Sequence, residues 1–294
     1  MENYRDENIV TIAKAVTRGV SLDFEVNEDF LIMHTLGKIR GAPIYYEKND
    51  PLLFSFYEHA KSVSPSIFDL VTLGSNKDKT RIGYSFERYH DWEDTFNDAP
   101  GVMRAYVASL KRDARFAKIL SETLERAREC KAQWENNYDA TKATVEALTG
   151  LDLDKNISVY ITHPRLNCGK VIETVNGVPS VNWGMNDLWP NYTTVYLWHE
   201  ALHWFFEHPG LHDKWTKEDI EKFNIDHVII QLIADYELAL QLNGDANYLP
   251  HKTGEWHFPK AMEKALPIWN RYKEEGVLNV YRLREMLSAD KGVR

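Results

Sequence analysis

Residues 196–206 of the 294-residue chain read YLWHEALHWFF and contain two histidines four positions apart, His199 and His203, with Glu200 directly after the first. The apolar residues around them predict a buried α-helix from Thr194 to about Phe206. On such a helix, side chains four residues apart lie on one face, a turn from each other. Both imidazoles can then reach one ion, so the stretch predicts a Zn²⁺ site with His199 and His203 as ligands.

The carboxylate of Glu200 is the predicted general base of this site. A carboxylate beside a metal ion can take a proton from the water that the ion activates. The surrounding sequence points to the same region, because seven of the 11 histidines lie between His199 and His257. We therefore expect the chemistry of the protein in this part of the chain.

Other periodic stretches predict the elements around this helix. Alternation predicts a strand at residues 157–161, and Asn176-Gly177 predicts a hairpin of residues 170–175 and 178–183. Residues 1 to about 98 show no sustained period, so little is predicted there. Helical periodicity predicts helices at residues 100–148, closed by Gly150, from Thr216 to Asn243-Gly244 with Asn224 as a candidate break, at 260–275 and at 278–288.

These elements predict an α+β fold. We expect a small β-sheet with an edge strand over the active-site helix, and a mostly α-helical remainder. Residues 1–150 would form a largely helical N-terminal segment that ends in a long helix, and residues 151–294 the domain that carries the site. One continuous domain is the alternative.

The pattern His199-Glu200-x-x-His203 on a helix, after a β-hairpin and before a second helix with acidic residues, resembles the zincin metallopeptidases over roughly residues 156–245. The thermolysin-like gluzincin group is the most similar. This resemblance implies a zincin-like catalytic domain in residues 151–294, whose edge strand pairs with extended substrate backbone. Residues 178–183 are the candidate strand, and Asn182 and Trp183 are the candidate substrate-binding residues.

The third zinc ligand is open between several residues. A gluzincin usually offers Glu-x-x-x-Asp on the next helix, but the matching register here begins with Gln231, and glutamine is a poor zinc ligand. Asp235 is preferred, because His227, Gln231 and Asp235 form one polar stripe. Glu237, about 160° around the helix axis from Asp235, is the first alternative. The remaining candidates are Gln231, His227, Glu221, Glu207 and Cys168, the last by similarity to peptide deformylase.

The predicted function is that of a zinc-dependent metallopeptidase. Three protein ligands leave one position on Zn²⁺ for water, and Glu200 takes the proton of that water and passes it to the leaving amine. His227 and Tyr248 are candidate catalytic residues that donate to the oxyanion, with Tyr236 and His251 as further candidates. Two other functions stay open: a non-catalytic zincin-fold binding or regulatory protein, motivated by Gln231, and hydrolysis of a non-peptide amide.

The composition excludes several other classes. Two cysteines cannot form a disulfide framework or a four-thiolate zinc site. A net charge of −9 without a Lys/Arg cluster disfavours a nucleic-acid partner. No stretch approaches the roughly 18 apolar residues of a membrane span, and the N-terminus lacks the pattern of a signal peptide. We therefore expect a soluble cytoplasmic protein that acts on a peptide or protein substrate.

Overall fold

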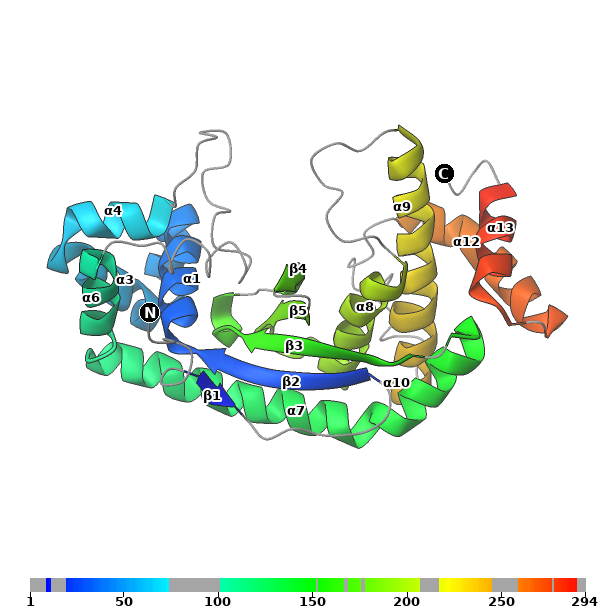
Figure 1. The fold of residues 1–294 in the computed structure, drawn as a ribbon, viewed down its shortest axis with the longest axis horizontal. Helices are drawn as coiled ribbons and strands as arrows, with labels where there is room; N and C mark the ends of the chain where they lie inside the picture. The colour runs from blue at the N-terminus through cyan, green and yellow to red at the C-terminus, as the bar shows by residue number, and fades with distance from the viewer. Residues whose placement is uncertain are drawn as a thin grey trace. The chain divides into compact units, whose positions relative to one another are not determined.

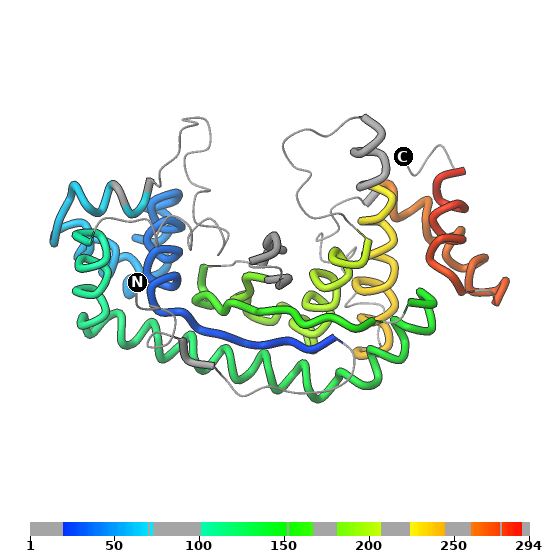
Figure 2. The backbone as a smooth tube through the Cα atoms, in the orientation of Figure 1, coloured from blue at the N-terminus to red at the C-terminus, as the bar shows by residue number. Residues whose placement is uncertain are grey.

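The computed structural model describes residues 9–11, 20–73, 101–151, 153–166, 169–175, 178–206, 217–244, 259–276 and 278–289 (Figure 2). Within these residues helices predominate and are accompanied by a small β-sheet, which confirms the expected α+β class. In chain order, and with the labels of Figure 1, the elements are β1 (Ile9–Thr11), β2 (Val20–Asn27), α1 (Glu28–Gly41), α2 (Pro43–Asn49), α3 (Pro51–Val63), α4 (Pro65–Leu73), α6 (Gly101–Leu110), α7 (Ala114–Thr149), β3 (Lys155–Ile161), the 3₁₀ turn η1 (Pro164–Leu166), β4 (Gly169–Val175), β5 (Val178–Trp183), α8 (Tyr192–Phe206), α9 (Lys217–Ile230), the π-helix η2 (Gln231–Leu238), α10 (Ala239–Asn243), α12 (Pro259–Glu275) and α13 (Val280–Ala289).

The chain divides into two compact units, and neither unit is a continuous segment. Unit 1 comprises Met1–Val16, Leu22–Lys131 and Asn156–Asn186, and unit 2 comprises Thr17–Ser21, Ala132–Lys155 and Asp187–Arg294. The long helix α7 therefore contributes its first part to unit 1 and its second part to unit 2. The division does not follow a cut at residue 150, because β4 and β5 belong to unit 1 while α8 and α9 belong to unit 2.

Nearly all of the sheet belongs to unit 1, and its strand order is β1-β2-β3-β5-β4. The predicted hairpin is confirmed: β4 and β5 pair antiparallel, with Val175 opposite Val178. However, β5 also pairs in parallel with β3, where Ile161 lies opposite Trp183. The prediction that residues 178–183 form an edge strand is therefore wrong, since both sides of β5 are occupied and β4 is the edge.

Helices α1 to α4 begin at capping residues or prolines that the sequence contains. The side chain of Asn27 accepts a hydrogen bond from the Phe30 backbone N–H (3.0 Å), and Asp50 accepts one from Leu53 (3.1 Å). Proline occupies the first position of α2, α3 and α4, where its missing N–H leaves no helical bond unmade. Asp50-Pro51 thus marks a helix start. Helix α1 packs against α3, α4 and α6, with which it forms one group in Figure 1.

Unit 2 contains the second part of α7 and the helices from α8 to α13 that the structure describes. Helix α8 packs against α9 and η2, and α12 and α13 pack against each other and against α9. Gly150 and Gly244 end α7 and α10 with φ of 67° and 63°, the left-handed conformation that glycine adopts without strain. The region from residue 217 to 243 does not break at Asn224; its winding changes from α to π at Gln231 instead.

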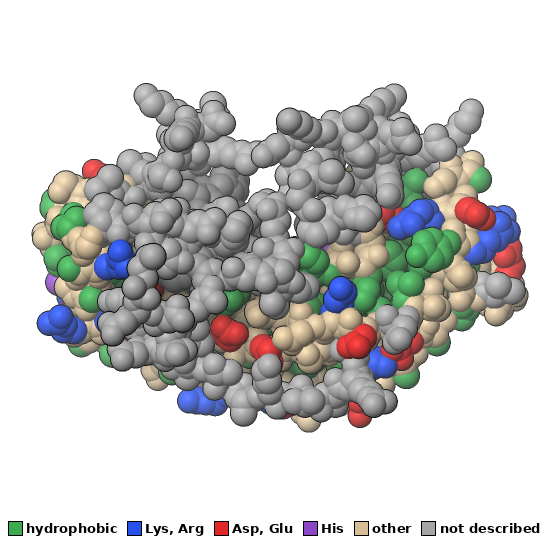
Figure 3. Space-filling model, viewed as in Figure 1, with side chains coloured by type: hydrophobic (Ala, Val, Ile, Leu, Met, Phe, Trp, Pro, Cys, Tyr) green, Lys and Arg blue, Asp and Glu red, His purple; other side chains and the backbone are tan. Residues whose placement is uncertain are grey.

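The surface of the described residues carries both signs of charge. On the face shown in Figure 3, acidic, basic and hydrophobic side chains are interspersed. Among the described residues, we find no helix that combines the length and the apolar character needed to cross a membrane.

Candidate metal centre

Helix α8 carries the two histidines that the sequence singled out, and its N-terminus is well capped. The carboxylate of Asp187 accepts hydrogen bonds from the Thr193 backbone N–H (3.1 Å) and hydroxyl (2.7 Å). The side-chain oxygen of Gln133, on α7, accepts one from the Thr194 backbone N–H (2.9 Å). These bonds satisfy N–H groups that a helix start otherwise leaves without partners, so they explain why the helix begins here.

The side of α8 next to the first histidine is fixed by an aromatic cluster. Trp198 is fully buried, and its indole N–H donates to the Thr141 hydroxyl of α7 (2.7 Å). Its ring lies 5.1 Å from that of Trp134 and 6.1 Å from that of Tyr138, centroid to centroid, and is nearly parallel to the latter. Both rings are on α7. Because Trp198 directly precedes His199, this packing holds the backbone that positions the imidazole.

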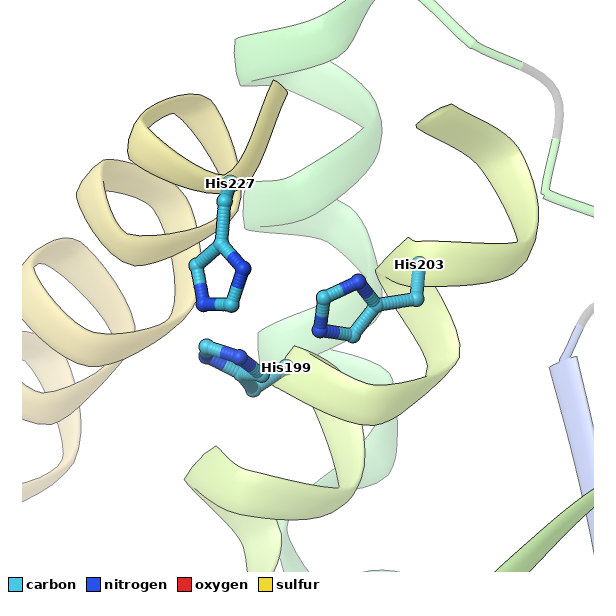
Figure 4. A group of neighbouring side chains, drawn as sticks. All are labelled: His199, His203 and His227. Atoms are coloured by element: carbon cyan, nitrogen blue, oxygen red, sulfur yellow. The ribbon is translucent and has the colours of Figure 1, made fainter. Parts of the chain in front are cut away.

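Three buried imidazoles converge on one point between α8 and α9. The ring centroids are 5.0 Å apart for His199 and His203, 5.1 Å for His199 and His227, and 4.9 Å for His203 and His227. One nitrogen of each ring lies within 4.8 Å of the other two. Figure 4 shows the three rings directed toward one another, two from α8 and one from α9. The structure thus brings the sequence-predicted pair together and adds His227 to it.

His227 owes its place to a helix that other contacts hold firmly. It lies near the end of α9, and the preceding residue, Asp226, is buried and bonded to the guanidinium of Arg284 on α13 (2.7 Å). From Gln231 onward the helix is π-wound, a rare geometry that occurs often at functional sites. His227, Gln231 and Asp235 follow one another at intervals of four residues across this change of winding.

Asp235 contacts the cluster through His199. Its Oδ1 lies 2.9 Å from Nδ1 of His199, and both side chains are buried. An ionised carboxylate can only accept, so this bond places the proton of a neutral His199 on Nδ1 and leaves the lone pair on Nε2. Carboxylates that hold a ligating histidine in this way are common behind metal ions. Asp235, the preferred third ligand in the sequence, therefore lies behind one histidine.

Glu237 points to a different part of unit 2. Its Oε1 accepts a hydrogen bond from the Trp269 indole N–H (2.6 Å) and pairs with the ammonium of Lys273 (2.5 Å), both on α12. Asp235 and Glu237 thus serve opposite sides of the helix, as the angle between them predicts. The structure does not bring Glu237 to the histidines.

The other predicted site residues are buried, half-buried or outside the described residues. Glu200 is buried on α8 (7% exposed), next to His199 in sequence. Asn182 and Trp183 are fully buried in the internal strand β5, so their side chains offer no surface to a substrate. Tyr236 is half-buried on η2. The side chain of Glu221 lies outside the described residues, as do four further candidates: Tyr248, His251, Glu207 and Cys168.

The donor set of the cluster consists of nitrogen atoms alone. Three neutral imidazoles suit Zn²⁺ and the later first-row metals, whereas Ca²⁺ and Mg²⁺ prefer oxygen ligands. Burial of polar ring nitrogens is costly unless hydrogen bonds or a metal ion compensate the lost hydration. The geometry thus fits a transition-metal ion.

Comparisons of the chain with protein-family models, with curated proteins and with solved structures gave no match. The interpretation of the site therefore depends on its residues and their arrangement.

Proposed function

We propose that the protein is a zinc-dependent hydrolase in which His199, His203 and His227 bind the metal ion. The observation that carries this proposal is the convergence of the three buried imidazoles. Three protein ligands leave one coordination position open, which is the pattern of catalytic rather than structural zinc. In this proposal His227 is the third ligand, Asp235 orients His199 and Glu237 stabilises the packing of α12.

Glu200 is the proposed general base. Zinc, when bound, would acidify a water molecule and polarise the carbonyl group of the substrate. Glu200, buried beside the first ligand, would accept the proton of the attacking water and deliver it to the nitrogen of the leaving amine. The bond from Asp235 would keep Nε2 of His199 available and its ring oriented throughout.

A peptide bond is the proposed substrate bond, in keeping with the resemblance of the His-Glu-x-x-His helix to zincin metallopeptidases. Hydrolysis of a non-peptide amide is the second candidate, because β5, the strand expected to bind extended peptide, is internal to the sheet. We propose no nucleic-acid partner, since the net charge is −9 and basic side chains are interspersed with acidic ones on the face in Figure 3. The cytoplasm stays the proposed compartment.

Metal analysis and one substitution test this proposal. Protein purified without added metal should contain close to one zinc per chain, and a library of mixed peptides should be cleaved, with the products identified by mass spectrometry. Glu200→Gln should keep the zinc and lose at least about 10²-fold in kcat, the size of a general-base contribution. A wild-type protein without metal would favour a binding or regulatory role instead. Zinc-loaded Glu200→Gln with undiminished turnover would overturn the mechanism.

A further inference from the structure

Gln231 is a polar residue that is not among the proposed metal ligands and has no other role in the proposed function. Its side chain is fully buried, and neither its amide oxygen nor its amide nitrogen has a hydrogen-bond partner among the described residues. An amide buried without partners loses its hydration and gains no hydrogen bond in return, which destabilises the fold. Such a cost is seldom kept in a core unless a group absent from the protein alone, such as a water molecule or a substrate, provides the partner.

The position of Gln231 identifies where that partner would lie. It follows His227 by four residues and precedes Asp235 by four, on the helix that packs against α8. His227 belongs to the imidazole cluster, and Asp235 bonds to His199. Gln231 is therefore flanked, one turn away on each side, by residues that reach the same site.

We infer that Gln231 contacts the substrate: its side-chain N–H groups donate to the carbonyl oxygen of the bond to be cleaved. This inference rests on the proposed hydrolase function. During attack by water, negative charge develops on that oxygen, and a donor already in place stabilises it without reorganisation. The carbonyl oxygen then supplies the acceptor that the amide nitrogen lacks in the protein alone.

The chemistry of glutamine suits this task better than that of the glutamate expected from the gluzincin pattern. A glutamate at position 231 could bind the metal and fill the position that the three histidines leave open, and it would repel an oxyanion. A neutral amide does neither, and it offers two N–H donors. Of the donors expected from the sequence, His227 belongs to the cluster itself, and Tyr236 is half-buried on η2. Tyr248 and His251 lie outside the described residues.

Gln231→Leu removes the donor and keeps most of the volume. The test compares zinc content, thermal stability, affinity of the zinc-loaded protein for acetohydroxamate by calorimetry, and kcat and KM for the peptide cleaved fastest in the library. The carbonyl oxygen of acetohydroxamate stands in for that of a substrate. Gln241→Leu is the matched control, because Gln241 is exposed and its amide bonds to the Ala140 carbonyl (3.3 Å).

In Gln231→Leu the zinc content should stay at the wild-type level and the melting temperature should not fall. The Kd for acetohydroxamate should rise about five- to tenfold, the worth of one hydrogen bond. The value of kcat should fall about 10²-fold while KM changes little. Gln241→Leu should match the wild type in every readout. If Gln231→Leu does not fold, Gln231→Met provides a second side chain without a donor.

Two results would overturn the inference while leaving the hydrolase proposal intact. One is unchanged acetohydroxamate affinity and kcat in zinc-loaded Gln231→Leu, which would make the amide a bystander. The other is loss of zinc from that variant, which would make Gln231 a ligand. A wild-type protein that binds no zinc contradicts the proposed function itself, so the two failures can be told apart.

Discussion

Each unit buries histidine, but the surroundings of the two sites differ. In unit 1, the fully buried His163 lies in a network of opposite charges. Its Nδ1 accepts from the Arg165 backbone N–H (3.4 Å), and its Nε2 donates to the Glu122 carboxylate (3.0 Å). Arg165 pairs with Glu122 and with Asp50 (3.0 Å to the latter). Burial lowers the pKa of His163, against the opposing effect of Glu122, so the ring is held neutral between fixed partners.

In unit 2, three imidazoles face one another, and the carboxylate of Asp235 bonds to Nδ1 of His199. In the proposed function, a metal ion at the centre of this cluster would bind one nitrogen of each ring. The side chain of the neighbouring Gln231 lacks a hydrogen-bond partner among the described residues. The two sites thus differ in their neighbours: His163 lies among charged side chains, whereas each imidazole of the cluster lies against two other imidazoles.

The largest expected effect distinguishes the two sites directly. His227→Ala should weaken zinc binding by more than about 100-fold, because a ligand is worth more than the 10–100-fold of the groups behind it. His163→Ala should lower stability and leave the zinc affinity unchanged. Competition with a zinc chelator of known affinity measures both variants. Equal zinc affinities for wild type and His227→Ala would contradict the proposal that His227 is a metal ligand.

Asp235→Asn should have the next largest effect. The amide can still contact Nδ1 of His199 but no longer stabilises its proton as an anion does, so zinc affinity or kcat should fall about 10–100-fold. Glu237→Gln is the control on the opposite side of the helix, where the carboxylate bonds to Trp269 and Lys273. A larger loss of zinc in Glu237→Gln than in Asp235→Asn would reverse the roles assigned to the two acids.

Thr141→Val tests the packing that holds α8. The change leaves the buried indole N–H of Trp198 without its acceptor and should lower the free energy of unfolding by roughly 1–3 kcal/mol. Urea denaturation measures the difference, and Thr141→Ser, which keeps the hydroxyl, should recover most of it. If valine proves as stable as threonine, the bond does not contribute to the position of the helix.

The smallest effect concerns His34, a buried histidine of unit 1 whose ring contacts that of Phe30 (5.3 Å between centroids). Burial, together with the charge of Lys38, lowers the pKa of His34 from 6.5 to about 3. The unfolded chain therefore takes up a proton below pH 6.5 while the folded chain does not, so stability is present above pH 6.5 and is lost progressively toward pH 3.

Between pH 7 and pH 5.5, this proton uptake should remove about 1 kcal/mol from the free energy of unfolding. His34→Leu should abolish that part of the pH dependence. Phe30→Leu, which removes packing but no titratable group, should shift the curve without changing its slope. Denaturation curves at several pH values measure both, and an unchanged slope in His34→Leu would contradict the lowered pKa.

Local patterns were sufficient to predict the helices that carry the site and the hairpin of the sheet. The apolar run around His199 and His203 predicts α8, Asn176-Gly177 predicts the hairpin of β4 and β5, and Gly244 predicts the end of the helix that begins in α9. Each of these signals lies within a few residues of the structure it specifies. The short helices α1 to α4 were not predicted, although Asn27 and Asp50 as caps and three prolines marked their starts.

Features that depend on distant parts of the chain could not be read in the same way. The internal position of β5 follows from its pairing with β3, about 20 residues earlier in the chain. The polar stripe of His227, Gln231 and Asp235 was recognisable, but which of them meets His199 and His203 depends on the packing of α8 against two helical segments. Glu237 remained an alternative because its partners, Trp269 and Lys273, lie more than 30 residues further on.

Zinc K-edge X-ray absorption on the protein as purified tests the central claim most directly. We predict one zinc ion per chain, surrounded by three imidazole nitrogens at about 2.0–2.1 Å and at least one further light ligand. Any zinc that His227→Ala retains should be bound by two imidazoles instead of three. Absence of zinc, or a wild-type spectrum with only two imidazoles and a protein carboxylate in place of His227, would contradict the assignment.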